Sequence, residues 1–349
     1  MDVVSVDKNF SVKEEFGRED IVFRSIDESP FSVHGVRFDG KRYGRMPEDV
    51  AYSVSEGVGW LSCHAAGGRV RFRTNSPFVA IRVALAQVSR LPHFPFTGSA
   101  GVDLYDGGKY VNTFMPRVDV VDHLSGLRAF HTEGMHDVTI NLPPYSAVTA
   151  MEIGLQEGAR LEAPTPYTYQ TPIVYYGSSI TQGGCTSRPG NTYEEIISRR
   201  LDTDYINLGF SGSAKGESAM SAYIQALDMS VFVYDYDYNA VSAEQLQATH
   251  ERMFKEIRAA KPTLPIIMAS RPIPYMVNEE ERVRRDIVRA TYENAVAAGD
   301  TNVYFVDGST IFDRFGGDSC TVDAVHPNDL GFMCMAEAFA PIIERCLKK

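Results

Sequence analysis

The chain changes its hydrophobic pattern near the middle. In the first half, apolar residues occupy every second position of several short runs, and Gly-Gly, Asp-Gly-Gly and Asn-Ser-Pro turn signals separate these runs. The positions that show this period most clearly are Val70, Phe72, Val79, Ile81, Val83, Leu85, Val138, Ile140 and Leu142. No helical stripe of comparable strength is visible between residues 36 and 155. The first half therefore predicts an all-β sandwich of a jelly-roll-like kind.

The second half alternates short apolar strands with helical segments. The strand candidates are 173–176, 205–208, 231–234, 266–269 and 303–306. Thr192 with Glu195, and Ser242 with Gln245, match the start signals of two helices between these strands, and further helices are expected over about 279–298 and 331–347. This alternation predicts an α/β domain with a parallel sheet covered on both faces.

Ala-Pro-Thr-Pro at 163–166 lies between the two patterns. Two prolines in four residues favour an extended, exposed connection. The length of 349 residues also favours about two domains. We therefore place the β-sandwich at 1–163, the linker at 164–171 and the α/β domain at 172–349.

A serine follows the first strand of the second half. Ser179 lies in Gly-Ser-Ser-Ile-Thr, a tight turn that would expose its hydroxyl at the sheet edge. Such a turn is weak evidence alone, because Gly and Ser also form ordinary turns. Asp323 and His326 add an orienting carboxylate and a base. The carboxyl ends of parallel strands share one edge, so these groups, 209–212 and 238–239 are expected to face a single cleft.

The segments at these strand ends resemble the marker blocks of the SGNH hydrolases of the GDSL type. They are Gly-Ser-Ser-Ile-Thr with Ser179, Asn-Leu-Gly-Phe-Ser-Gly with Gly212, Asp-Tyr-Asp-Tyr-Asn with Asn239, and Asp-x-x-His-Pro-Asn with His326. Gly-Val-Asp-Leu-Tyr at 101–105 is similar to the GxDLY signature of the β-sandwich that precedes a bacterial subgroup of these esterases. The resemblance covers nearly the whole chain and implies a flavodoxin-like three-layer α/β/α fold for the second domain.

The resemblance implies a serine esterase without a cofactor. Ser179 would be the nucleophile, His326 the base and Asp323 the carboxylate that orients the imidazole. The oxyanion hole would consist of the backbone N–H groups of Ser179 and Gly212 and the side-chain amide of Asn239.

The chain departs from the family pattern at two places. Ser178 stands where the broad family has Asp, and Asp237 and Ala240 flank Asn239 where Gly and Asp are usual. Neither change removes a catalytic group.

Ser178, Tyr238 and Arg271 are candidates for the substrate pocket. Each has a plain structural alternative: a structural turn residue for Ser178, aromatic packing at a strand end for Tyr238, and a strand stop for Arg271, which precedes Pro272.

Family members with a leading β-sandwich are often carbohydrate esterases, so the resemblance implies small acyl esters, above all acetyl esters of a glycan or small molecule. The chain has no long apolar lid of the kind that long-chain lipids favour. Two alternatives stay open: a lipid or lysophospholipid esterase, and a carbohydrate-binding protein whose hydrolase half has lost activity.

The composition of the chain limits the classes of molecule that it is expected to bind. The net charge of −11 argues against nucleic acid and anionic membrane surfaces. No apolar run approaches the roughly 20 residues that span a bilayer. The chain begins without a visible signal peptide, which leaves two localisations open: extracytoplasmic if a leader has been removed, otherwise cytoplasmic. The oligomeric state is open as well.

The five cysteines show no CxxC spacing, and the histidines show no HExxH motif. Cys185 lies shortly after Ser179, and Cys320 lies shortly before Asp323. If these catalytic candidates assemble, the two cysteines come close together and either form a disulfide or stay free thiols.

Residues 235–239 resemble the opening of an EF-hand loop, but Ala240 and Leu246 stand where that loop needs Gly and Glu. We therefore expect no metal site. The remaining histidines are expected at the surface or in the core, and Trp60 in core packing rather than as a sugar-stacking platform.

Overall fold

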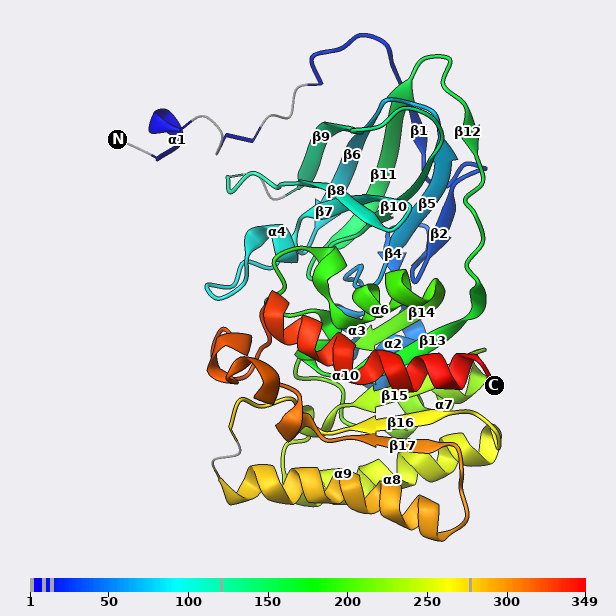
Figure 1. Cartoon of the computed structure of the whole chain (residues 1–349), viewed down its shortest axis with the longest axis vertical. Coiled ribbons are helices and arrows are strands. Elements are labelled where there is room, and N and C mark those ends of the chain that lie inside the picture. Colours follow the sequence, from blue (N-terminus) through cyan, green and yellow to red (C-terminus); the bar gives the residue numbers. More distant parts are fainter. Residues whose placement is uncertain (1–2, 8–10, 13–15, 120–121, 276–277) are drawn as a thin grey trace.

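In the computed structural model, an antiparallel β-sandwich precedes a three-layer α/β/α unit (Figure 1). The structure describes residues 3–7, 11–12, 16–119, 122–275 and 278–349, so Met1 and Asp2 at the chain start lie outside the described residues. A short helix, α1 (Val3–Val6), precedes the sandwich. Both predicted fold classes are confirmed.

The sandwich has two antiparallel sheets. The first has the order β1 (Ile21–Ser25), β11 (Ala147–Gln156), β6 (Phe78–Ala86), β9 (His123–Ala129). The second has the order β12 (Leu161–Glu162), β5 (Arg69–Thr74), β10 (His136–Asn141), β7 (Val102–Asp106), β8 (Lys109–Phe114), and β2 (Ser32–His34) also pairs with β5. A ribbon of β3 (Arg37–Phe38) and β4 (Tyr43–Gly44) adds to them. The alternating residues named above form the core between the sheets, as expected from a period of two.

Three short helices lie in the first half, which was predicted as all-β: α2 (Glu48–Val54), α3 (Glu56–Leu61) and α4 (Phe96–Ser99). Helix α3 begins after Ser55, whose Oγ accepts a hydrogen bond from the Val58 N–H at 3.1 Å. Ala51 and Val58 pack into the core of the α/β unit rather than into the sandwich. These helices are too short to show a repeated apolar stripe, which is why the pattern missed them.

The α/β unit has five parallel strands in the order β14, β13, β15, β16, β17. Their bounds are β13 (Tyr169–Gly177), β14 (Thr203–Gly209), β15 (Val231–Asp235), β16 (Ile266–Ala269) and β17 (Val303–Val306). This is the flavodoxin-like order, with the first strand beside the second and third. All five predicted strands are present, because each is a continuous apolar run buried between two helical layers.

Helices cover both faces of this sheet. One face carries α6 (Tyr193–Leu201) and α10 (Asp329–Leu347), and the other carries α7 (Ser218–Ala226), α8 (Ala243–Ala260) and α9 (Glu279–Ala297). Thr192 caps α6 by accepting from the Glu195 N–H at 3.4 Å, whereas the Glu195 carboxylate accepts from the Tyr205 hydroxyl at 3.0 Å. None of the helices in the described ranges has the length and hydropathy needed to cross a membrane.

The GxDLY segment joins the two units. The fully buried Asp103 carboxylate accepts hydrogen bonds from the Gly190 N–H at 2.8 Å and from the Asn141 amide at 2.9 Å, and pairs with Arg188 at 3.1 Å. Burial raises the pKa of Asp103, and Arg188 opposes that shift. The signature thus ties the sandwich to the loop before α6. The boundaries at 163 and 171 stay a prediction, and β13 begins within the expected linker.

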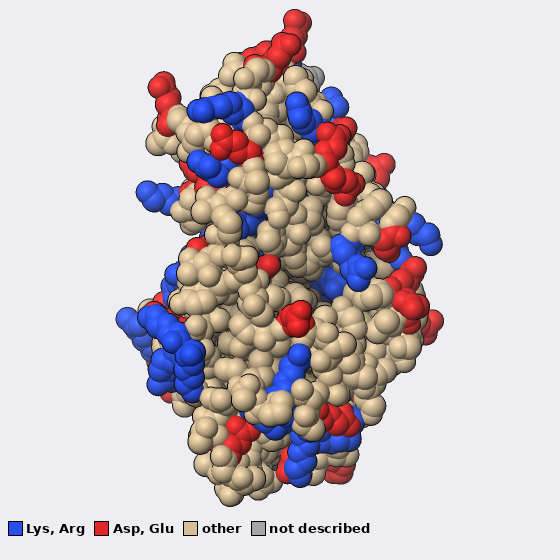
Figure 2. Space-filling model, turned by 90° about the vertical axis from the view of Figure 1, so that its right-hand side faces the viewer, with Lys and Arg blue, Asp and Glu red and all other residues tan. Residues whose placement is uncertain are grey.

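The face shown in Figure 2 carries acidic and basic side chains interspersed among uncharged ones. Several basic side chains gather at the left edge of that face, and elsewhere basic and acidic side chains lie close together (Figure 2).

Candidate active site

The nucleophile candidate lies at the end of β13. Helix α5 (Ser179–Gln182) begins with Ser179, whose exposed fraction is 6%. Ser178 is buried and caps this helix, because its Oγ accepts from the Ile180 N–H at 3.2 Å. This contact matches the structural alternative for Ser178 rather than a place in the substrate pocket. A side chain at Gly177 would overlap the Asp235 carboxylate and the Thr181 hydroxyl, so the tight turn requires glycine.

The three predicted catalytic side chains form one hydrogen-bonded chain. Ser179 Oγ lies 2.9 Å from His326 Nε2, and His326 Nδ1 lies 2.8 Å from Asp323 Oδ2. His326 and Asp323 come from the loop between β17 and α10, about 150 residues beyond the serine. The parallel sheet brings these segments to the same edge, as the strand order predicts.

The Asp323 carboxylate is held by its own loop. Its Oδ1 atom accepts from the backbone N–H groups of Val325 at 3.1 Å and His326 at 2.7 Å, which leaves Oδ2 for the imidazole. Ala324, which directly follows Asp323, has a φ of +66° in the left-handed region. Burial alone would raise the pKa of Asp323, but the bonds from His326 and Val325 and the charge of His326 hold it below its usual range.

The oxyanion candidates lie on the two neighbouring strand ends. Gly212 has a φ of +66° in the turn after β14, and in the described part of the chain its N–H donates to no protein acceptor. Asn239 ends the short helix η3 (Asp237–Asn239), and its amide donates to the Phe210 carbonyl at 2.9 Å. This bond ties Asn239 to the turn that carries Gly212. One amide hydrogen of Asn239 stays available for a ligand.

Two buried carboxyl groups lie beneath the site. Asp235 accepts from the Thr181 hydroxyl and, at 3.4 Å, from the Tyr193 hydroxyl. Burial raises the pKa of Asp235 to about 8 and that of Asp237 to about 6, so Asp235 is largely neutral at pH 7. The sequence analysis gave this segment as the marker block with Asn239 and as a failed EF-hand opening, and it did not predict two buried carboxyl groups.

The first domain contributes side chains that the sequence did not predict. The ring centroid of Phe94 lies 6.2 Å from that of His326 and 4.8 Å from that of Tyr145. The Tyr145 hydroxyl donates a hydrogen bond to the Ser179 carbonyl at 3.2 Å. His93 Nε2 lies 3.9 Å from Asp323 Oδ2, so this partly exposed histidine lies beside the hydrogen-bonded chain, a position that the sequence analysis did not predict. No motif marks these residues, because they act through the docking of two domains.

Two cavities flank the hydrogen-bonded chain. One, of about 490 Å³, is lined by Tyr238, Arg271 and Val325, and the Arg271 guanidinium stacks on the Tyr238 ring at 3.9 Å. The other, of about 620 Å³, is lined by Trp60, Leu91, Tyr145 and Ser211. Trp60 is 44% exposed, so its expected role in core packing is wrong.

All five cysteines are free thiols, which resolves the open question in favour of two free thiols at Cys185 and Cys320. Cys320 Sγ lies 4.0 Å from Cys334 Sγ of α10 instead. Burial and the charge of Asp323 raise the pKa of Cys185 to about 12.

A three-layer α/β/α unit with Ser179 at its sheet edge is the fold of an SGNH hydrolase. Residues 170–344 match the GDSL-like lipase/acylhydrolase family, and residues 21–161 match the N-terminal domain of SGNH-hydrolase-type esterases. The chain belongs to the GDSL-like lipase/acylhydrolase family, a family of ester hydrolases. No curated protein matches it in a sequence comparison.

Solved structures share the two-domain architecture. A putative GDSL-like lipase from Bacteroides ovatus is 25% identical, with 94% of this chain and 98% of that one covered and a TM-score of 0.83. The salicylyl-acyltransferase SsfX3 of a tetracycline biosynthetic pathway is 21% identical, with coverage of 94% and 98% and a TM-score of 0.78. An acetyl xylan esterase from the rumen bacterium Butyrivibrio proteoclasticus is 12% identical, with coverage of 95% and 99% and a TM-score of 0.59. At 21% and 12% identity, the acyltransferase and the acetyl xylan esterase are similar to this chain in fold alone.

Proposed function

We propose that the chain is a serine esterase that removes small acyl groups, above all acetyl groups, from carbohydrate esters. The observation that carries the proposal is the hydrogen-bonded chain from Ser179 through His326 to Asp323, beside a turn whose Gly212 N–H has no acceptor among the described residues. This arrangement supplies a nucleophile, a base and an orienting carboxylate within hydrogen-bond reach.

In this mechanism Ser179 Oγ attacks the ester carbonyl carbon while His326 Nε2 takes the hydroxyl proton. The tetrahedral oxyanion is stabilised by the N–H groups of Ser179 and Gly212 and by the Asn239 amide. His326 then gives its proton to the leaving alcohol. Water, activated by the same imidazole, hydrolyses the acyl-enzyme and releases the acid. Asp323 keeps the proton on Nδ1 throughout and stabilises the imidazolium.

The surroundings of Ser179 favour a small acyl group. Its exposed fraction is 6%, and Phe94 and Tyr145 crowd the backbone beside it, so that a Cβ added at Gly184 would lie only 3.2 Å from either side chain. A short acyl chain needs little room there, whereas a long one needs an apolar channel.

Trp60 supports a carbohydrate as the alcohol part of the ester. Its exposed indole lines the 620 Å³ cavity together with Ser89 and Ser211, which offer hydroxyl groups. An aromatic face beside a few polar groups suits a sugar ring, with its apolar C–H face and polar edge. The likeness in fold to an acetyl xylan esterase agrees with this substrate class.

The direct test is acetate release from a panel of acetylated glycans. The wild-type chain should release acetate, and Ser179→Ala should release none, because the nucleophile is lost. Full activity in Ser179→Ala would refute the assignment. Trp60→Ala should raise KM for an acetylated oligosaccharide at least about tenfold while nitrophenyl acetate turnover stays nearly constant. Equal loss on both substrates would argue against a sugar platform.

Two further measurements separate the alternatives. A preference for nitrophenyl esters of eight carbons or longer would favour a lipid or lysophospholipid esterase. If the protein binds glycans but forms no fluorophosphonate adduct at Ser179, the result would favour an inactive carbohydrate-binding protein.

A further inference from the structure

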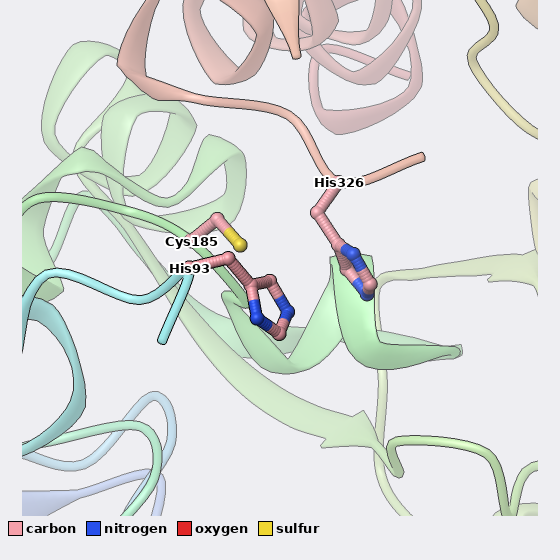
Figure 3. A group of neighbouring side chains, drawn as sticks. All are labelled: His93, Cys185 and His326. Carbon is pink, nitrogen blue, oxygen red and sulfur yellow. The ribbon is translucent and has the colours of Figure 1, made fainter. Parts of the chain in front are cut away.

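Three metal-ligating side chains from distant segments meet beside the proposed catalytic chain. His93 comes from the sandwich, Cys185 from the loop after α5 and His326 from the loop before α10, and their ligand atoms all lie within 4.8 Å of one another (Figure 3). Among the residues that the structure describes, no other group of three His, Cys, Asp or Glu side chains meets this criterion.

We propose that His93, Cys185 and His326 bind a divalent transition-metal ion of the zinc class, and that the bound ion inhibits the esterase. Two imidazoles and one thiolate form a donor set that zinc, cobalt and copper prefer over magnesium or calcium. The ion would be an inhibitor and not a cofactor, because His326 cannot serve as ligand and base together.

The distances fit an ion after a small movement. Zinc bonds of about 2.0–2.3 Å in a tetrahedral site place donor atoms roughly 3.3–3.8 Å apart. Donors within 4.8 Å must therefore approach one another by about 1.5 Å at most. The His93 side chain is 32% exposed, so its ring has room to turn. Figure 3 shows the Cys185 thiol directed toward the two imidazole rings.

The backbone conformation at Cys185 gives a second reason to include this cysteine in the proposed metal site. Its φ of +70° lies in the left-handed region, where glycine is favoured and a residue with a Cβ is strained. Cys185 follows two glycines, yet the left-handed position itself carries a cysteine whose exposed fraction is 3%. The strained position places the sulfur in the cluster.

Asp323 is the fourth group at this site. Its Oδ2 atom lies 3.9 Å from His93 Nε2 and 2.8 Å from His326 Nδ1. A carboxylate there either completes the tetrahedron or accepts a hydrogen bond from a ligand imidazole, and both roles are common at zinc sites. Binding replaces the Cys185 thiol proton, which passes to solvent, and no group changes oxidation state.

The inhibition would follow from competition for His326. A metal on the imidazole removes either the Nδ1–H···Asp323 bond or the Nε2 lone pair that takes the Ser179 proton. This half of the proposal rests on the proposed esterase function, whereas metal binding does not.

Binding is tested with Co²⁺ on the Ser179→Ala chain, which keeps all three ligands. We expect one Co²⁺ per chain and a thiolate-to-cobalt charge-transfer band in the near ultraviolet, lost on addition of Zn²⁺. Cys185→Ser in the same background should lose the band, while the matched control Cys346→Ser should keep it. Absence of the band in the folded Ser179→Ala chain, or a band that survives Cys185→Ser, would overturn the site.

Inhibition is tested separately with Zn²⁺ on the active chain. Zn²⁺ should lower nitrophenyl acetate turnover, and His93→Ala should raise the half-inhibitory Zn²⁺ concentration at least about tenfold relative to the exposed control His131→Ala. A cobalt band without inhibition by Zn²⁺ would refute the inhibitory role and leave the binding site standing. Because the band is measured on an inactive variant, failure of the esterase proposal would not affect it.

Discussion

Replacement of Asp323 by asparagine tests how the loop controls the His326 imidazole. Asp323 Oδ1 accepts two backbone N–H groups at 3.1 and 2.7 Å, and Oδ2 accepts from His326 Nδ1. In Asp323→Asn the amide oxygen should keep the two backbone donors. The amide NH₂ then faces Nδ1, so the imidazole must carry its proton on Nε2 and cannot accept the Ser179 proton.

The expected loss in kcat follows from the two orientations that the new side-chain amide of the variant Asp323→Asn could adopt. Turning the NH₂ group toward the backbone would sacrifice two hydrogen bonds of about 1 kcal/mol each and leave two donors unpaired, so this orientation is disfavoured by about 2–3 kcal/mol or more. The unproductive tautomer therefore dominates. Loss of the correct tautomer in a Ser-His-Asp triad lowers kcat by about 10⁴-fold. At about 1.36 kcal/mol per tenfold change, this corresponds to about 5.5 kcal/mol of transition-state stabilisation.

Initial rates of nitrophenyl acetate hydrolysis measure kcat and KM for this variant. KM should change little, because Asp323 does not reach the substrate. Asp318→Asn is the matched control, since Asp318 lies in the same segment and its Oδ1 accepts from the Ser319 N–H at 2.9 Å. Thermal unfolding should show both variants folded. If folded Asp323→Asn keeps more than a tenth of the wild-type kcat, the proposed control of the tautomer is wrong.

Three further predictions concern single side chains. Asn239→Ala should lower kcat by about 100–1,000-fold, because one oxyanion donor is lost, as initial rates will show. Ser178→Ala should lower the free energy of unfolding by about 0.5–2 kcal/mol, measured by urea denaturation, because the α5 cap is lost. The pKa of Asp235 is raised by burial to about 8, so its stabilisation is complete below about pH 4 and declines as the pH rises toward 8. Relative to wild type, Asp235→Asn should gain up to about 1.4 kcal/mol of unfolding free energy per pH unit across this window.

Each of these has a clear contrary result. A loss in Asn239→Ala that appears in KM instead of kcat would place Asn239 in ground-state binding. Unchanged stability in Ser178→Ala would mean that water replaces the cap without cost. Parallel stability curves for wild type and Asp235→Asn between pH 5 and 8 would show that Asp235 is ionised in the folded chain.

The strands of the α/β domain were predictable from the sequence because burial repeats along the chain, whereas their flavodoxin-like order was implied only by the family resemblance. A strand between two helical layers is apolar at every position, and a strand in a sandwich is apolar at every second position. Both patterns are local and recur over many residues. Thus β16 and β17 begin and end where the pattern predicts, and the parallel order alone brings Ser179 and His326 to one edge.

The short helices of the first half escaped prediction for the opposite reason. Helices α2 and α3 have seven and six residues, fewer than two turns each, so no apolar stripe can repeat. Ala51 and Val58 are buried against the second domain rather than their own. Their burial is set by the docking of the two domains, which a local pattern does not contain.

By itself, the sequence determined the two fold classes, the turn that carries Ser179 and the loop that carries Asp323 and His326. Only the tertiary structure decided what surrounds them: Phe94 and Tyr145 beside Ser179 and His326, Trp60 in the second cavity, and His93 and Cys185 beside His326. The physical reason is that backbone pattern and turn chemistry are local, whereas contacts between loops of different domains depend on how two finished surfaces dock. Buried polar contacts such as that of Asp103 with the Gly190 N–H hold this docking in place.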